Sequence, residues 1–112
     1  MSVDETPDHE AYVEAVLSVV EQIPPGRVCS YGDVAELVGR GGPRNVGQVM
    51  SLHGGAVAWW RVIRADGRPV AGLEGDALDR LRGEGVVFRG VRGDRVDLRV
   101  SRWDGAGMTN ID

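Results

Sequence analysis

Three polar side chains in the middle of the chain share a helical spacing. Arg44, Gln48 and Ser51 stand at positions i, i+4 and i+7, which places them on one face of a predicted helix, with Gly47 beside them. The surface they make is shallow and carries one long cation at its N-terminal end. Such a surface can approach the narrow minor groove of DNA, and its arginine can enter the base stack. The alternative is a solvated helix face on which the arginine has no particular function.

Residues able to act as nucleophiles or metal ligands are scarce. The chain has one cysteine, Cys29, and two histidines, His9 and His53. Because no histidine lies near Cys29 in the sequence, we interpret this thiol as a small, partly buried hydrophobe and not as a reactive group. One cysteine and two histidines cannot complete a four-ligand zinc site. The sequence therefore predicts neither a metal nor another cofactor.

The net charge of -4 hides a division along the chain. Residues 1–22 carry six acids and no base, whereas residues 23–103 carry all thirteen arginines against nine acids. The chain has no lysine, so its strong cations are all planar guanidinium groups, which suit phosphates, base edges and stacking. Since the body of the chain is basic, the acidic total argues only weakly against a nucleic-acid partner.

Apolar periodicity predicts the helices that would position these residues. Apolar side chains at three- and four-residue spacing predict a helix over residues 6–23. Ser30 and Asp33 have the spacing of a capping box, which predicts a second helix over residues 30–38. A third helix is predicted over residues 43–52. Two short helices joined by a glycine-rich turn are typical of a helix-turn-helix.

The pattern changes after the third helix. Apolar runs on both sides of Asp66-Gly67 predict one β-hairpin, and runs on both sides of Gly93-Asp94 predict a second. Between the two hairpins, apolar residues within 77–81 predict another short helix.

The length of 112 residues suits one domain. We expect a mostly helical, winged-helix-like α+β domain over residues 8–103, with flexible termini at 1–7 and 104–112. No apolar stretch is long enough to span a membrane, and the acidic N-terminus lacks the features of a secretory signal. A cytoplasmic location is therefore predicted, and we expect a monomer.

Three segments follow one another in a distinctive order: IPPGRVCSYGDVA, then GPRNVGQVM, then AWWRVIRADG. Their order and spacing resemble the O6-alkylguanine-DNA alkyltransferases, and the resemblance covers residues 10–103. It is closer to the alkyltransferase-like proteins, which are non-enzymatic relatives of those enzymes. The resemblance implies the fold of the C-terminal DNA-binding domain of the alkyltransferases, with a helix-turn-helix that contacts the minor groove.

The third segment decides which branch of the family the chain resembles. The enzymes carry their acceptor cysteine in a proline-cysteine-histidine-arginine-valine run, and here that run reads Ala58-Trp59-Trp60-Arg61-Val62. Tryptophan at the cysteine position is the mark of the alkyltransferase-like group. Trp59 has no nucleophile and Trp60 replaces the activating histidine, so the resemblance implies that the protein is not an enzyme. The group usually keeps proline and histidine at the positions of Ala58 and Trp60.

The resemblance also assigns roles to single residues. Tyr31 matches the tyrosine that presses on the phosphate beside the target nucleotide, and Arg44 matches the arginine that fills the vacated base stack. Trp59 would line a pocket for the flipped base, although both tryptophans could instead be core residues, Trp60 more readily than Trp59. Arg68 is a candidate for stacking over the alkylated base. Arg61 would support the fold. The minor-groove face would comprise Asn45, Gly47, Gln48 and Ser51.

The function implied by the resemblance is damage sensing. An O6-alkylguanine in double-stranded DNA would be flipped into the pocket, and the bound protein would mark the lesion for nucleotide excision repair proteins. Two alternatives remain. An alkyltransferase using Cys29 as acceptor would gain the mass of the alkyl group, and a dimeric helix-turn-helix regulator would read undamaged DNA in the major groove. The shallow face with Gly47 and Ser51 counts against the regulator.

Overall fold

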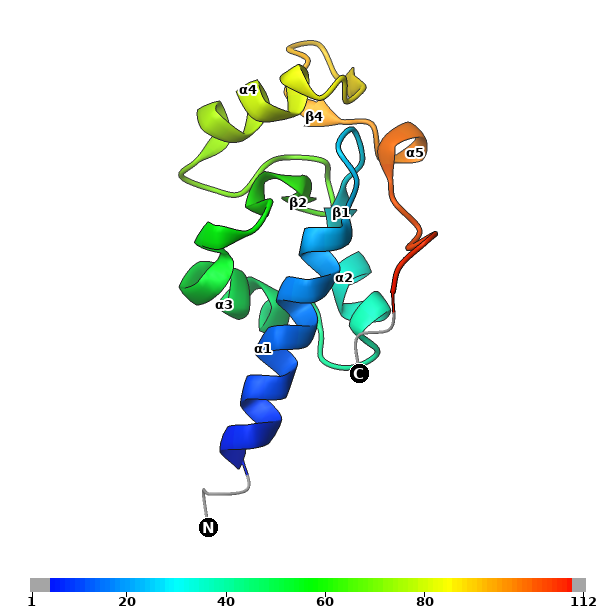
Figure 1. Ribbon diagram of the computed structural model, residues 1–112. Coiled ribbons are helices and arrows are strands. Elements are labelled where there is room, and N and C mark those ends of the chain that lie inside the picture. The colour runs from blue at the N-terminus through cyan, green and yellow to red at the C-terminus, as the bar shows by residue number, and fades with distance from the viewer. Residues whose placement is uncertain (1–4, 110–112) are drawn as a thin grey trace.

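Helix α1, Glu5–Gln22, runs along one side of the molecule (Figure 1). The computed structural model describes residues 5–109. The helix has the predicted apolar spacing, and Val16 and Val19 on its inner face are fully buried. Because the helix already begins at Glu5, residues 5–7 are helical and do not form the loose leader that we expected.

Helices α2, Tyr31–Val38, and α3, Pro43–His53, form the predicted pair joined by a short turn. The capping box is present: the N–H of Asp33 donates to Ser30 Oγ at 3.0 Å, and the N–H of Ser30 donates to Asp33 Oδ2 at 2.9 Å. This reciprocal pair satisfies two backbone donors at the start of α2. Gly39 then ends α2 with a φ of 92°, the left-handed conformation that glycine adopts without strain.

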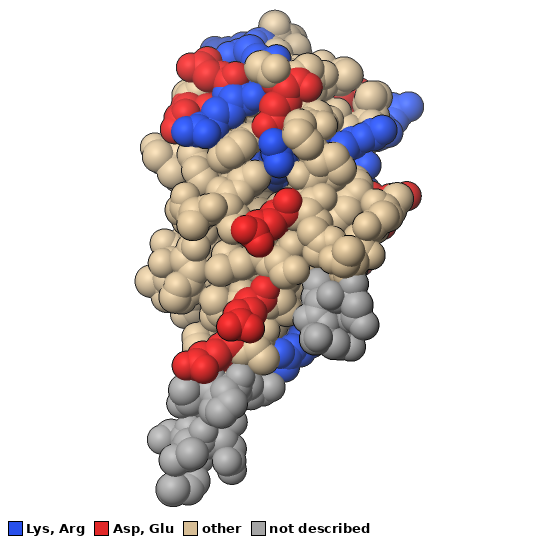
Figure 2. Space-filling model, in the orientation of Figure 1, with Lys and Arg blue, Asp and Glu red and all other residues tan. Residues whose placement is uncertain are grey.

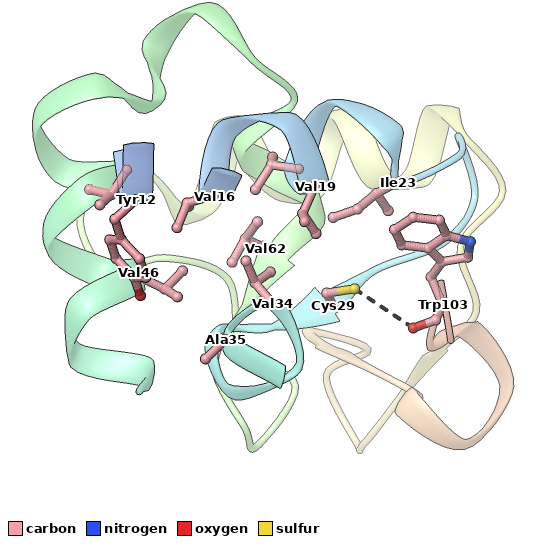
Figure 3. Packing of buried hydrophobic residues seen from close by; sticks show 12 residues of the cluster. Tyr12, Val16, Val19, Ile23, Cys29, Val34, Ala35, Val46, Val62 and Trp103 are labelled. Atoms are coloured by element: carbon pink, nitrogen blue, oxygen red, sulfur yellow. Dashed lines mark hydrogen bonds between the residues drawn. The ribbon is translucent and has the colours of Figure 1, made fainter. Parts of the chain in front are cut away.

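The three helices pack around one hydrophobic core (Figure 3). Val34 of α2 and Val46 of α3 meet the inner side of α1, and both are fully buried. Removal of these apolar side chains from water is the main force that fixes the helices relative to one another. It also determines which face of α3 points outward.

A short parallel pair lies beside the helices. Strand β1, Cys29–Ser30, pairs with β2, Val62–Ile63, in the register Cys29↔Val62 and Ser30↔Ile63. The first predicted hairpin is therefore wrong. A tight turn does form around Asp66-Gly67, where the N–H of Gly67 donates to the carbonyl of Arg64 at 2.9 Å. Pro69 follows that turn and has no N–H with which to extend an antiparallel ladder across it, whereas β2 pairs with β1.

Helix α4, Glu74–Gly83, and the antiparallel pair of β3, Phe88–Arg89, and β4, Arg95–Val96, form the other end of the molecule (Figure 1). They confirm the predicted short helix and the second hairpin. The chain then forms a one-turn helix, α5, Leu98–Ser101, where a continuing strand was expected, because the Asp97 side chain caps that turn. A second cluster of buried side chains joins these elements: Val28, Ile63, Leu81, Val86 and Val96.

The segment 104–109 lies against α1 and α2, although we expected a flexible terminus there. Met108 packs against the main core, and Gln22 Oε1 accepts hydrogen bonds from the N–H (2.7 Å) and the Oγ1 hydroxyl (3.0 Å) of Thr109. These single contacts leave no periodic signal in a glycine-rich stretch. The remaining positions of both predicted termini lie outside the described residues. No helix in the described part of the chain is long and apolar enough to cross a membrane.

Candidate nucleic-acid interface

Helix α3 presents the predicted polar face to solvent. Arg44, Gln48 and Ser51 are exposed, whereas Val46 and Val49 on the other side of the helix are 0% and 3% exposed. The core therefore holds α3 with its shallow polar face outward and with one long cation near its N-terminal end.

Asn45 has a structural function that the sequence analysis missed. The backbone N–H of Gly42 donates to Asn45 Oδ1 at 2.9 Å, which closes the first turn of α3. The three-residue spacing between Gly42 and Asn45 was the available signal. Asn45 is nevertheless exposed, on the same helix as the polar face. His53 at the end of α3 is also exposed.

A pocket of about 420 Å³ opens beside this face. Its volume lies within the range of about 300–1,000 Å³ that is usual for small-ligand sites. The wall contributed by α3 includes Gly47 and Ser51, while Tyr31 comes from α2 and Trp59 from the 3-10 turn η3, Trp59–Arg61. The short turn η2, Gly54–Ala56, adds backbone to the same wall. Apolar contacts come from Met50, Val70 and Leu73.

The structure does not bring Arg68 to this pocket. Its side chain is exposed, and its Nε lies 3.7 Å from Asp66 Oδ2. The N–H of Arg68 also donates to Asp66 Oδ1 at 3.0 Å, so the turn holds the residue beside that carboxylate. Val70 and Leu73 line the pocket in the segment where we had placed an arginine.

Tyr31 is half-buried at the first position of α2. Burial raises the pKa of its phenol, and the positive charge of Arg64 only partly opposes the rise. The hydroxyl therefore keeps its proton at neutral pH and can donate a hydrogen bond at the pocket wall.

The adjacent tryptophans have different environments. Their rings meet edge to face, with centroids 5.8 Å apart and planes at 89°. Trp59 lines the pocket, whereas Trp60 packs against the second cluster and its Nε1–H donates to Glu84 Oε2 at 2.8 Å. The guanidinium of Arg80 lies over both rings, 5.7 Å from the Trp59 centroid and 4.6 Å from the Trp60 centroid.

Glu84 is a structural centre that the sequence analysis missed. It accepts hydrogen bonds from Trp60 Nε1, from Arg61 Nε and Nη2, and from the N–H of Gly26, while Arg61 Nη1 donates to the carbonyl of Ile23 at 2.9 Å. Burial alone would raise the pKa of Glu84, but these hydrogen bonds and the charge of Arg61 outweigh it and lower the pKa. Arg61 thus has the supporting role that we predicted.

Cys29 is fully buried in the main core, where its Sγ lies 3.7 Å from the carbonyl oxygen of Trp103 (Figure 3). Burial, followed by the negative charge of Asp33, raises the pKa of the thiol to about 12. The reactive species in alkyl transfer is the thiolate, so this environment disfavours the alternative in which Cys29 accepts the alkyl group.

The family model described as the 6-O-methylguanine DNA methyltransferase, DNA binding domain, matches residues 11–86. The chain belongs to this family. A DNA base-flipping protein of Vibrio parahaemolyticus is 31% identical over 101 residues, which cover 84% of this chain and 97% of that protein. Alkyltransferase-like protein 1 of Schizosaccharomyces pombe is 38% identical over 84 residues, 69% of this chain and 78% of that protein.

Solved structures of the Schizosaccharomyces pombe alkyltransferase-like protein have the same fold. One, in complex with damaged DNA containing O6-carboxymethylguanine, has a TM-score of 0.67 and 33% sequence identity and covers 84% of this chain and 94% of that chain. Another, in complex with DNA, has a TM-score of 0.65 and 32% identity over 92% of this chain and 98% of that chain. These relatives confirm the predicted mostly helical α+β class and the resemblance to alkyltransferase-like proteins.

Proposed function

We propose that this protein binds O6-alkylguanine lesions in double-stranded DNA by flipping the damaged nucleotide, without removing the alkyl group. The observation that carries the proposal is the pocket of about 420 Å³ that contains Tyr31 and Trp59 and opens directly beside the outward face of α3. Solved relatives with this fold were obtained in complex with DNA and with alkylated DNA, which supports DNA as the partner.

Each element has a defined task in this mechanism. Helix α3 lies in the minor groove, where its small residues Gly47 and Ser51 permit close approach. Arg44 enters the base stack and occupies the space of the extruded nucleotide. Tyr31 presses on the adjacent backbone, and Trp59 provides a flat wall for the flipped base.

The lesion itself supplies the selectivity. Flipping costs a few kcal/mol, and it costs least for a base whose pairing is already damaged. Met50, Val70 and Leu73 place apolar atoms at the pocket, so an alkyl group gains about 0.8 kcal/mol for each buried methylene. Both effects favour the alkylated base over guanine.

The pocket binds and does not react. None of the described residues that line it is a cysteine, and the single thiol of the chain, Cys29, is fully buried elsewhere with a pKa of about 12. Trp59 stands where the enzymes of the family have the acceptor cysteine. Because the lesion remains in the DNA, we propose that the bound protein, acting in the cytoplasm as a monomer, marks it for nucleotide excision repair proteins.

A titration of matched duplexes tests this function. Fluorescence anisotropy at a stated salt concentration should give tighter binding to a duplex with one O6-methylguanine than to the same duplex with guanine. Equal affinities would refute lesion sensing. Mass spectrometry of the protein after incubation should find no added methyl group, and a gain of that mass would establish an alkyltransferase instead.

Arg44→Ala should weaken lesion binding at least tenfold, because no side chain then fills the space that the flipped base leaves in the base stack. Arg92→Ala is the matched control: it removes an exposed arginine from the β3–β4 turn, at the end of the molecule away from α3 (Figure 1). Equal losses of affinity in both variants would mean that Arg44 contributes only its positive charge and does not enter the base stack.

A further inference from the structure

Arg64 and Tyr31 are brought together by the parallel strands. β1 ends with Ser30 and β2 ends with Ile63, and these two residues are register partners. Tyr31 directly follows β1 and Arg64 directly follows β2. Because the strands are parallel, both residues lie at the same end of the pair. Paired strands are about 4.8 Å apart, so the backbones of Tyr31 and Arg64 lie close together at the carboxyl ends of the strands. The charge of Arg64 also acts on the Tyr31 phenol.

In the described part of the chain, the environment of the Arg64 side chain differs from that of other arginines in the fold. Arg64 is half-buried, yet within residues 5–109 it makes no hydrogen bond or ion pair through its guanidinium. Two arginines nearby in the fold contrast with it: Arg61 pairs with Glu84 at 2.7 Å and Arg102 pairs with Asp33 at 2.9 Å.

The charge of Arg64 acts on Asp66, but this carboxylate interacts with other arginines as well. Asp66 is held by Arg68, whose backbone hydrogen bond is the main cause of the lowered pKa of that carboxyl. The charges of Arg68, Arg95 and Arg64 all act on the same carboxylate. One acid therefore serves three guanidinium groups, and the turn after β2 has an excess of positive charge.

The hydroxyl beside Arg64 is a proton donor. Burial raises the pKa of Tyr31, and the charge of Arg64 reaches this phenol and partly opposes the rise. A protonated hydroxyl and a planar guanidinium both donate hydrogen bonds to an anion. The phenol oxygen is the only hydrogen-bond acceptor in the pair. This pair suits an oxyanion with several acceptor oxygens, of which phosphate is the one that DNA presents.

We infer that Arg64 and Tyr31 together bind one backbone phosphate of DNA at the rim of the pocket that Tyr31 lines. This inference rests on the proposed function, because the phosphate is that of the nucleotide whose base enters the pocket. Pro43, the first residue of α3, packs close to Gly32 of α2, so the N-terminal end of α3 with Arg44 lies near the same site. Insertion of Arg44 and fixation of the phosphate then act on one nucleotide from two sides.

Salt-dependent titration with matched variants tests the inference. Wild type, Arg64→Ala, Arg64→Lys and Arg68→Ala are each titrated with damaged and undamaged duplex at several salt concentrations. Arg64→Ala should lose about tenfold in affinity for the damaged duplex in 0.1 M salt, and the slope of log K against log salt should become shallower by about one. Arg64→Lys should restore most of the slope, and Arg68→Ala, which removes an exposed arginine already paired with Asp66, should change it little.

A double-mutant cycle tests whether the two groups share a phosphate. The losses of Tyr31→Phe and Arg64→Ala should be clearly less than additive, and additive losses would overturn the shared site. An unchanged slope in Arg64→Ala, with its thermal unfolding unaltered, would overturn the phosphate contact. Wild type without any lesion preference would refute the proposed function, whereas the slope of Arg64→Ala would still decide whether this residue binds phosphate.

Discussion

The two adjacent tryptophans illustrate how environment separates identical side chains. The N–H of Trp60 is taken by Glu84 and its ring packs on the second cluster, so it belongs to the framework. Trp59 meets Trp60 edge to face, lies beneath the guanidinium of Arg80 and lines the pocket. The framework residue therefore holds the pocket residue in position.

Alanine substitutions should separate these two roles. Trp59→Ala should lower the preference for damaged over undamaged duplex about tenfold, because a base loses its stacking surface, with little change in the urea midpoint. Trp60→Ala should cost about 2–4 kcal/mol in the free energy of unfolding, because it removes a packed ring and leaves Glu84 with one donor fewer. Urea unfolding and duplex titration of both variants measure this, and the reverse assignment of effects would contradict it.

Glu84→Gln should change the pH dependence of stability. The pKa of Glu84 lies below its ordinary value of 4.5, so the charged form stabilises the fold above that pH. This stability is lost as the pH falls through the lowered pKa of the folded protein. At pH 7 the variant should be less stable by about 2 kcal/mol, since Arg61 loses its ion pair.

The difference in unfolding free energy between wild type and Glu84→Gln should then shrink as the pH is lowered below about 4.5. Urea unfolding at a series of pH values gives this difference directly. A difference that stays constant from neutral to acid pH would mean that the charge of Glu84 contributes nothing. Glu36→Gln, at an exposed position of α2, is the control for a lost charge without such partners.

At the scale of elements, predictions from the sequence succeeded where the signal is local. The capping box of Ser30 and Asp33, the proline that opens α3 and the alternation around Gly93-Asp94 each lie within a few residues, and all three elements are present. The pairing of β1 with β2 was not predicted, because it joins segments that are far apart in the chain. Local alternation cannot reveal a parallel partner.

The candidate site follows the same division. The polar face of α3 is a periodic pattern, so Arg44, Gln48 and Ser51 were predicted on one side of the helix. The pocket wall formed by Val70 and Leu73 was not predicted, because the segment after Gly67 matched the family poorly and its path depends on contacts with β4. The structure places Arg68 beside Asp66 instead. The Glu84 centre was overlooked because its partners, Gly26, Trp60 and Arg61, come from two segments far from it in the chain.

Gly67 is the element-scale feature that holds that segment. It has a φ of 92°, and a Cβ added to it would lie 2.6 Å from the carbonyl oxygen of Val96. Gly72 has nearly the same φ, 91°, with open space around it. Gly72→Ala should cost about 1 kcal/mol from backbone strain alone, and Gly67→Ala should cost about 1–3 kcal/mol more from the clash with β4. Thermal unfolding of both variants measures the difference, and equal costs would exclude the clash.

At the scale of the whole molecule, charge is unevenly distributed. Acidic side chains follow one another along α1, whereas acids and arginines alternate at the end formed by α4 (Figure 2). Helix α1 runs close to α3, the helix that we propose to face DNA, since one recess is lined by residues of both helices. In the proposed complex, a duplex on α3 therefore lies in the field of an acidic helix. That field opposes binding of any DNA, damaged or not.

Neutralising the acidic side chains of α1 should raise the affinity for DNA without changing the preference for damaged over undamaged duplex. Glu10, Glu14 and Glu21 are exposed on α1, and their combined replacement by glutamine removes three negative charges without disturbing the core. Affinity for damaged and undamaged duplexes should rise by the same factor, about threefold or more at low salt, because long-range repulsion acts on phosphates and not on the flipped base. The gain should fade near 1 M salt, where the Debye length is about 3 Å. Replacement by aspartate at the same positions keeps the charge and should leave the affinity unchanged. A gain in affinity confined to the damaged duplex would place these acids in direct contact with the lesion site. Such a gain would contradict a purely electrostatic role.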